Sequence, residues 1–585
     1  MKKSIFGPSI SAIPLTSSDD GNRVQMAANF QRQSLVLSNP ELPLLSTPYL
    51  SQITKGSSFY QTALRDSTII YSDSEVIVYS DASGRVRISR LPNVLWESTN
   101  AESVKKDDWL VKHWAIKYGR YCYGSNLNIV FAPFKGWNYE DAIVVSETGA
   151  SKLVTRHSIE LEFVVHPGEV VMKHINEGTY VRKGDVLFEM IEEPRNLVNV
   201  LCAGAHKSTV YSDYDCTINR ITTYFKNEEV LEKHKSSGPF LDWVKKYSIY
   251  HRMNNLRNIL KTFDPQLSKV VSLYYPENYE LISNPDSILV KIECLVVKQL
   301  RVGDKLGNRH GNKGVVSKIV PDELVRSEDG WVPDLILNPL GVVSRMNIGQ
   351  IFEMHLGEIC RNVEKRIRHS FGEGKFEDAK KILETLESQL DAKIPYIHDT
   401  NMDLQQQLES LIENGLTVEL PLYTREMHRK ILDLLEYYEL SPLKRFEFVE
   451  GLPKDYGYGT CYFMPLVHTV ESKFSARADG PYHSKTLQPI DSVSDDAGQR
   501  LGEMEIWALL AYGADHNVVE ALGAKADDIG AKEQMIAHIL RTGLSPTVPE
   551  TFYTNHVLHL YMYSLGIPIE SDIVTEEVLF KKETI

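Results

Sequence analysis

One short segment concentrates the cationic side chains of this sequence. Residues 298–318 contain six lysines or arginines and one aspartate, whereas the whole chain of 585 residues has a formal net charge of −14. Lysine and arginine donate charge-assisted hydrogen bonds to phosphate oxygens, and glycine lets the backbone approach a ligand closely. The segment therefore predicts a site for a polyphosphate or a nucleic-acid backbone. A solvated, glycine-rich surface loop is the alternative.

The spacing inside this segment favours a loop. Arg301, Lys305, Arg309 and Lys313 recur every fourth residue, which would form a stripe on a helix, but four interspersed glycines make a helix improbable. The loop is not a P-loop, because Asn312 stands where G-x-x-x-x-G-K-[ST] requires glycine.

Metal-binding signals are weak in this sequence. Nucleotidyl transfer by two metals needs a carboxylate cluster, and there is no Asp-x-Asp-x-Asp run. Asp213 and Asp215 come nearest, without a third acid, and a surface turn explains them better. The six cysteines form no C-x-x-C pair, so we expect no zinc in this chain.

Length and composition indicate a protein of several domains. At ~100–200 residues per domain the chain should hold roughly three to five packed units. No window approaches the ~18 apolar residues of a membrane helix, and Pro8 and the polar residues 17–20 interrupt any export signal. We expect a cytoplasmic protein that does not contact a membrane. The net negative charge argues against coating of nucleic acid by bulk charge.

Periodicity predicts the elements that must position the basic segment. Alternation of apolar and polar residues predicts short antiparallel strands over 66–90, and a β module over 158–192 with turns at Gly178 and Gly184. Helical periodicity predicts a helical block over 350–440, with polar joints at 371–375 and 398–402. Residues 502–541 again have a helical pattern, with breaks predicted at Gly513, Gly523 and Gly530. The predicted fold class is α+β.

Five blocks of the sequence resemble the β subunit of bacterial multisubunit RNA polymerase. They occur in the family's order and lie at residues 13–33, 138–147, 303–317, 338–350 and 476–509. The resemblance covers the C-terminal half of that subunit, which implies a split β subunit of the kind found in giant bacteriophages. Archaeal split subunits are less similar.

The resemblance implies a particular architecture. It predicts a double-psi β-barrel, a β-rich flap or wall module, a helical insertion and a C-terminal segment that helps to build the clamp. The implied boundaries are 1–150 for a hybrid-binding region with the first part of the barrel unit, 151–290 for the flap or wall module, 291–356 for the barrel core with the basic loop, 357–455 for the mainly helical insertion, and 456–585 for the return to the hybrid-binding region and the clamp and partner-anchoring segment.

Roles for individual residues also follow from the resemblance. Lys305 and Lys313 match the barrel lysines that contact phosphates near the RNA 3′ end, and Arg345 is expected with them at the catalytic centre. Arg23 and Arg345 match contacts to the incoming triphosphate, and Glu140 and Asp141 match an acidic pair near its magnesium. The expected hybrid-binding residues are Asn29, Gln33, Arg309 and His310.

Each assignment has a structural alternative. Arg23 could pair with Asp19 or Asp20, and Glu140 and Asp141 could form a solvated turn after Gly136. Arg345 could cap a helix or pair with Glu353.

The sequence also departs from the family's pattern at three points. Leu306-Gly307-Asn308 replaces the family's Met-Ala-Gly, which leaves the backbone path of the basic segment open. Ser475 stands where the family has histidine, and acidic residues occupy 491–496 in place of a glycine-rich stretch.

The resemblance implies a subunit of a DNA-directed RNA polymerase, a nucleotidyltransferase active only in a multisubunit complex. Expected partners are a chain with the N-terminal half of β, β′-like chains, template DNA, RNA and a specificity factor. The β′-like chains are expected to supply most of the ligands of the catalytic Mg²⁺. One alternative is a catalytically silent structural subunit derived from a polymerase. Another is a single-chain nucleotidyltransferase or glycosyltransferase that uses Asp213 and Asp215.

Overall fold

The computed structural model divides into two compact units, Met1–Ser472 and Lys473–Ile585. It describes residues 6–192, 207–226, 228–234, 238–269, 271, 286–395, 397, 403–448, 452–490, 497–526, 529–544 and 553–567. The expected joint at 398–402 and the acidic segment 491–496 lie outside these ranges.

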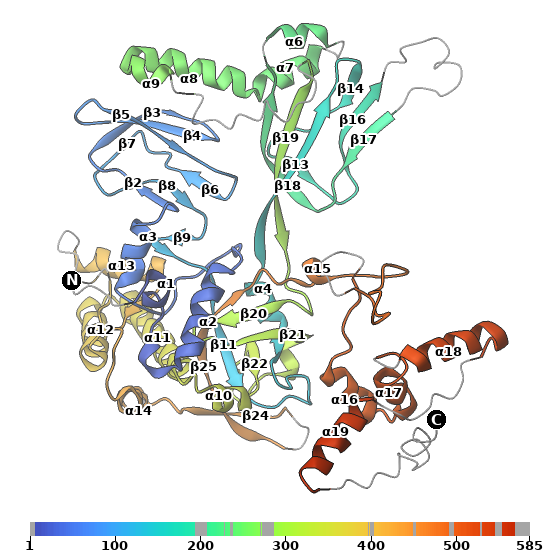
Figure 1. Cartoon of the computed structure of the whole chain (residues 1–585). Helices are drawn as coiled ribbons and strands as arrows, with labels where there is room; N and C mark the ends of the chain where they lie inside the picture. The colour runs from blue at the N-terminus through green and yellow to red at the C-terminus, as the bar shows by residue number, and fades with distance from the viewer. Residues whose placement is uncertain are drawn as a thin grey trace, which may run out of the picture. The chain divides into compact units, whose positions relative to one another are not determined.

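The first unit contains a closed β-barrel of six strands (Figure 1). Neighbouring strands pair in the order β11, β22, β12, β21, β20 and β25, and β25 pairs back with β11 to close the ring. β24 extends the sheet from β25. The bounds are β11 (Ser125–Phe131), β22 (Leu335–Leu337), β12 (Ala142–Ser146), β21 (Lys313–Val320), β20 (Lys305–Asn308), β25 (Lys454–Pro465) and β24 (Leu443–Phe446).

Apolar strands from three distant parts of the sequence build the core of this barrel. One buried cluster includes Leu127, Ile143, Leu306, Val316 and Phe463. Side chains on the other face of β11, β12, β21, β22 and β25 belong to a second buried cluster, so these strands are covered on both faces. The barrel therefore fixes its strands rigidly relative to one another.

About half of the basic segment is strand, at residues 298, 305–308 and 313–318, and the prediction of a loop over 298–318 is wrong for these residues. Lys298 ends β19 (Ile288–Lys298), and β20 and β21 form an antiparallel pair in which Leu306 lies opposite Gly314. Only residues 309–312, called here the connector, join the two strands. Pairing of β20 with β25, about 150 residues later, overrides the local preference of glycine for loops.

Two β-rich regions accompany the barrel. The strands predicted over 66–90 are confirmed as β3 (Ser67–Ser72), β4 (Val76–Asp81) and β5 (Val86–Arg90), which pair antiparallel. The β module predicted over 158–192 is also present. Its bounds are β13 (Thr155–Val165), β14 (Glu169–Lys173), β15 (Tyr180–Val181), β16 (Val186–Glu192), β17 (Lys207–Tyr211), β18 (Cys216–Tyr224) and β19, with α6 (Glu228–Lys233), α7 (Gly238–Lys246), α8 (Ile249–Phe263) and α9 (Pro265–Lys269).

The helical block is confirmed as α11 (Gly349–Gly372), α12 (Phe376–Leu390), α13 (Leu404–Asn414) and α14 (Met427–Tyr437). The joint predicted at 371–375 lies where α11 ends and α12 begins. One apolar stripe on each helix packs into a shared buried cluster, which explains the helical periodicity of the sequence.

The second unit is helical, with α16 (Glu503–Ala511), α17 (Asp515–Leu522), α18 (Ile529–Thr542) and α19 (Tyr553–Ser564). Breaks at Gly513 and Gly523 are confirmed, but the break at Gly530 is wrong, because this glycine lies in the first turn of α18. No side chain of α16 is buried, and Met504, Trp507 and Leu510 are each about half exposed.

The remaining elements are short. They are α1 (Pro8–Ser11), α2 (Gly21–Arg32), α3 (Tyr49–Lys55), α4 (Glu147–Lys152), α10 (Leu340–Arg345), α15 (Val470–Lys473), the 3-10 turns Thr16–Ser18 and Asp322–Leu324, β1 (Leu45–Ser46), β2 (Tyr60–Thr62), β6 (Trp96–Ser98), β7 (Ser103–Val104), β8 (Trp109–His113), β9 (Ile116–Lys117), β10 (Arg120–Tyr121) and β23 (Val418–Glu419). Among the described residues, no helix has the length and apolar character needed to cross a membrane.

Candidate active site

The hairpin of β20 and β21 lies close to two other segments of the chain. A Cβ atom at Gly311, which has φ of +73°, would collide with the carbonyl of Arg23 on α2. A Cβ atom at Gly314 would collide with the carbonyl of Asp141 and the side chain of Ile143. Only glycine allows these approaches, so the two glycines bring α2 and the segment before β12 against the hairpin.

Asn308 determines the path of the connector. Its buried side-chain oxygen accepts hydrogen bonds from the backbone N–H of His310 at 2.9 Å and of Asn312 at 3.0 Å. Asn308 N–H donates in turn to the Asn312 carbonyl at 2.9 Å. The departure from the family's Met-Ala-Gly therefore supplies a side chain that closes the turn.

Two half-buried arginines, Arg23 and Arg345, and the exposed Asp141 form a cluster beside the hairpin, called here the arginine cluster. Arg345, the last residue of α10, forms an ion pair with Asp141. Burial, and then the nearby Arg345 guanidinium, lower the pKa of Arg23, whereas Asp141 acts in the opposite direction. Arg23 also donates to the carbonyl of Gly311 at 3.5 Å. The cluster brings together three of the residues expected around a triphosphate.

Left-handed backbone occurs at both sides of this ion pair. Glu140 has φ of +52° and Met346 has φ of +54°, although neither is glycine. Such conformations cost of order 1–3 kcal/mol and concentrate at functional sites. The exposed Glu140 side chain lies next to Asp141 in the turn before β12.

Lys305 and Lys313 begin the two strands of the hairpin. Lys313 is exposed, and its ammonium lies 5.7 Å from the ring centroid of Phe30 on α2. The main chain of Lys305 is held by Leu466 N–H at 2.9 Å and by the carbonyl of His468 at 3.3 Å. Neither ammonium forms an ion pair within the described part of the chain. Both remain available to an anionic ligand.

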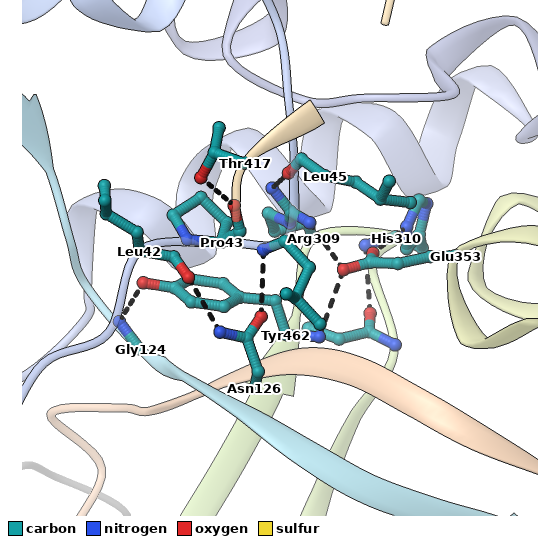
Figure 2. A network of polar contacts seen from close by, with 12 residues as sticks. Leu42, Pro43, Leu45, Gly124, Asn126, Arg309, His310, Glu353, Thr417 and Tyr462 are labelled. Carbon is teal, nitrogen blue, oxygen red and sulfur yellow. Dashed lines mark hydrogen bonds and ion pairs between the residues drawn. The ribbon is translucent and has the colours of Figure 1, made fainter. Parts of the chain in front are cut away.

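A second charged cluster, called here the buried network, includes Arg309 and His310 of the connector (Figure 2). Arg309 donates to the Leu45 carbonyl at 2.7 Å and to Glu353 at 2.5 Å. His310 contacts the same Glu353 carboxylate at 2.5 Å and Asp19 at 2.6 Å. The network joins the connector to α11 and to the segment before α2.

The charges of the buried network stabilise one another. Burial would lower the pKa of His310, but Asp19 and Glu353 outweigh it and raise that pKa to about 9. Burial would raise the pKa of Glu353, but Arg309 and His310 lower it to about 2. An imidazolium ion therefore lies between two carboxylates.

The expectation that Arg309 and His310 face a nucleic-acid hybrid is not supported. Arg309 is 1% exposed and His310 is fully buried. Composition revealed their charge but could not reveal that Glu353 and Asp19 enclose them. Glu353 itself stands in an apolar helical stripe, a position where a carboxylate usually signals a buried partner.

The structural alternatives for the arginines also have clear outcomes. The Asp19 carboxylate contacts His310 and accepts a hydrogen bond from Gly349 N–H. Asp20 caps α2 through Asn22 N–H at 3.0 Å and acts to raise the pKa of Arg23 electrostatically, although the described residues show no ion pair between the two. Glu353 belongs to the buried network, so it is not the partner of Arg345.

Three further residues keep surface positions. Asn29 is exposed on α2 and accepts a hydrogen bond from Arg32, and the Gln33 carbonyl accepts from Val467 N–H at 2.9 Å. Their contact with a hybrid stays a prediction. Ser475 is exposed and its hydroxyl accepts from Gln499 at 2.9 Å.

Comparison with known families assigns the chain. Residues 171–494, more than half of the sequence, match the family described as RNA polymerase Rpb2, domain 6. The chain belongs to this Rpb2 family. Residues 497–573 match RNA polymerase Rpb2, domain 7.

Curated relatives of this Rpb2-family chain are named DNA-directed RNA polymerase subunit beta. The protein of Mycoplasma pneumoniae is 29% identical over 93% of this chain and 41% of its own length. The protein of Prochlorococcus marinus strain MIT 9515 is 28% identical over 97% of this chain and 48% of its own length. The chain thus spans less than half the length of these two relatives.

The Rpb2-family chain has few carboxylates placed to hold a metal. Within the described ranges, no group of three or more histidine, cysteine, aspartate or glutamate side chains could hold an ion. Asp213 and Asp215 lie exposed between β17 and β18, where Asp215 accepts from Lys183 N–H at 2.7 Å. This position fits a surface turn and not the centre of a single-chain transferase.

Proposed function

We propose that this chain is a β-type subunit of a DNA-directed RNA polymerase and forms half of its active centre. The observation that carries the proposal is the arginine cluster beside two unpaired lysines on a rigid barrel hairpin. Guanidinium groups bind phosphates bidentately and keep their charge, which suits a triphosphate. A silent structural subunit would have no need of unpaired cations held in this way.

The residues would act by position and charge. Lys305 and Lys313 would hold phosphates at the RNA 3′ end, while Arg23 and Arg345 would orient the incoming triphosphate. In phosphoryl transfer such positioning and charge stabilisation supply most of the catalysis. Arg309 and His310 would contribute indirectly, by fixing the connector that carries Lys313.

Magnesium fits this chain only as an ion whose protein ligands are shared with a partner chain. When bound, Mg²⁺ would neutralise charge that develops on the transferring phosphate. Glu140 and Asp141 could contribute oxygen ligands near the triphosphate, but a partner chain must supply most of the coordination.

The proposed assembly contains several other molecules. They are a chain with the N-terminal half of β, β′-like chains, template DNA, RNA and a specificity factor. We further propose a split subunit of the giant-bacteriophage kind and double-psi topology for the barrel. The exposed apolar side chains of α16 support burial of the second unit by a partner. Mass determination of the chains in the native complex tests the split, and a single longer β chain would contradict it.

The decisive experiment is templated RNA extension on a preformed RNA:DNA scaffold. The complex is purified through a tag on this chain, as wild type, Arg345→Ala and Arg368→Ala. Loss of a positioned donor to developing charge typically costs ~10²–10³-fold in rate, so Arg345→Ala should assemble but extend poorly. Arg368, on α11 and paired with Glu364, is the matched arginine control and should extend normally. Equal extension by all three, or none by the assembled wild type, would favour the silent subunit.

A further inference from the structure

The carboxylate of Asp141 is the anion that pairs with Arg345 in the arginine cluster. It pairs with Arg345 and acts electrostatically on Arg23, so it faces both arginines of the cluster. The two guanidinium groups repel each other, as the effect of Arg345 on Arg23 indicates. Asp141 therefore offsets a repulsion that a phosphate group would offset equally well.

The main chains of both partners are anchored, whereas their side chains are accessible. Val315 N–H on β21 donates to the Asp141 carbonyl at 3.0 Å, and Met346 N–H, just after Arg345, donates to the Val342 carbonyl at 2.9 Å. The Asp141 side chain is 45% exposed and that of Arg345 is 20% exposed. An ion pair this exposed contributes only ~0–1 kcal/mol, so a multivalent anion can displace it. Side-chain rotation alone suffices for the exchange.

We propose that Asp141 is a built-in substitute for phosphate, which holds Arg345 until a triphosphate displaces it. The exchange rests on the proposed function and adds a regulatory step to the same site. The Arg345 guanidinium is paired with the Asp141 carboxylate before the triphosphate binds and with a phosphate afterwards. The released carboxylate then becomes available to the cation that accompanies the triphosphate. Asp141 is thus a positioning residue that competes with the substrate.

A binding measurement on the full chain tests this exchange. Inorganic tripolyphosphate, without divalent metal, is titrated into the wild type, Asp141→Asn, Glu147→Gln and Arg345→Ala by calorimetry at low salt. An internal competitor lowers apparent affinity by the fraction of sites left open, so removal of a pair that contributes ~0–1 kcal/mol should tighten binding roughly 2- to 6-fold. Glu147→Gln removes the same charge from an exposed carboxylate in the first turn of α4, outside the arginine cluster, and should change affinity less than twofold. Thermal unfolding of each variant confirms that it is folded.

The outcomes separate the exchange from the proposed function. Tighter binding by Asp141→Asn alone, with weaker binding by Arg345→Ala, supports the exchange. Unchanged or weaker binding by Asp141→Asn, or equal tightening by Glu147→Gln, overturns the exchange and leaves the phosphate site intact if Arg345→Ala still weakens binding. Binding that is insensitive to Arg345 overturns both.

Discussion

The buried network and the arginine cluster flank the same hairpin and use the same chemistry in opposite ways. In the buried network, the side chains of Arg309 and Glu353 are 1% and 2% exposed, and each has more than one partner. In the arginine cluster, the side chains of Arg345 and Asp141 are 20% and 45% exposed, and a single ion pair joins them. The degree of burial therefore distinguishes an ion pair that stabilises the fold from an ion pair that can exchange its partner.

The physical reason lies in desolvation. A buried charge cannot recover its hydration, so removal of one partner leaves the other uncompensated at a cost of ~3–5 kcal/mol. An exposed charge is readily solvated again, and its pair contributes little. The buried network therefore holds the connector that precedes Lys313 in place, whereas the cations of the arginine cluster stay available to a ligand.

The largest expected effect comes from breaking the buried network. Glu353→Gln should lower the free energy of unfolding by ~3–5 kcal/mol, because Arg309 and His310 lose their shared counter-ion. Urea denaturation followed by fluorescence measures the loss. Glu364→Gln, on the same helix and in an exposed pair with Arg368, is the control, with an expected loss of at most ~0.5 kcal/mol. Similar losses in both variants would mean that burial does not distinguish the two kinds of pair.

The second effect concerns pH. The pKa of His310 is raised from its ordinary 6.5 to about 9, so the native state binds a proton that the unfolded state releases. Its stabilisation is complete below pH 6.5 and is lost as the pH rises through 9, by up to ~3 kcal/mol. Denaturation of the wild type and His310→Gln from pH 6 to 9.5 measures it. Parallel pH profiles would show that His310 is not the titrating group.

Much of the fold followed from the sequence because local periodicity reports which faces are buried. The strands of 66–90, the β module and the helical block all have a regular apolar pattern. The closed barrel had no such local signal, because β11, β20 and β25 come from parts of the chain about 150 or more residues apart. For the same reason Gly314, which lies in β21 and allows close packing against Asp141, resembled a loop glycine.

The residues of the candidate site were predictable from the sequence. Which of them are buried and which are accessible was not. Arg23, Asp141 and Arg345 are brought together, as their matched blocks implied. Arg309 and His310 belong to the same motif as Lys313, yet tertiary contacts with Glu353 and Asp19 bury them. No local pattern distinguishes a buried cation from an exposed one. The individual roles and the expected domain boundaries stay predictions.

A smaller effect should separate the hairpin lysines from other surface lysines. Each phosphate contact that is lost lowers the slope of log affinity against log salt by ~1. Lys313→Ala should therefore reduce this slope by about one for RNA:DNA scaffold binding to the complex. Lys381→Ala, on the exposed face of α12, is the lysine control and should leave the slope unchanged. An equal reduction in both would mean that binding depends on diffuse charge and not on the hairpin.

The smallest effect is the sharpest test of the comparison. Asp141→Asn makes the same carboxylate-to-amide change as Glu353→Gln, but at the exposed pair. Because water can solvate Arg345 again, the free energy of unfolding should change by less than ~1 kcal/mol in urea denaturation. The same variant should nevertheless alter tripolyphosphate binding. A loss of stability equal to that of Glu353→Gln would make Asp141 a structural residue, and the exposed pair would then be as fixed as the buried one. A small loss combined with altered binding would mean that this carboxylate serves the ligand site and not the fold.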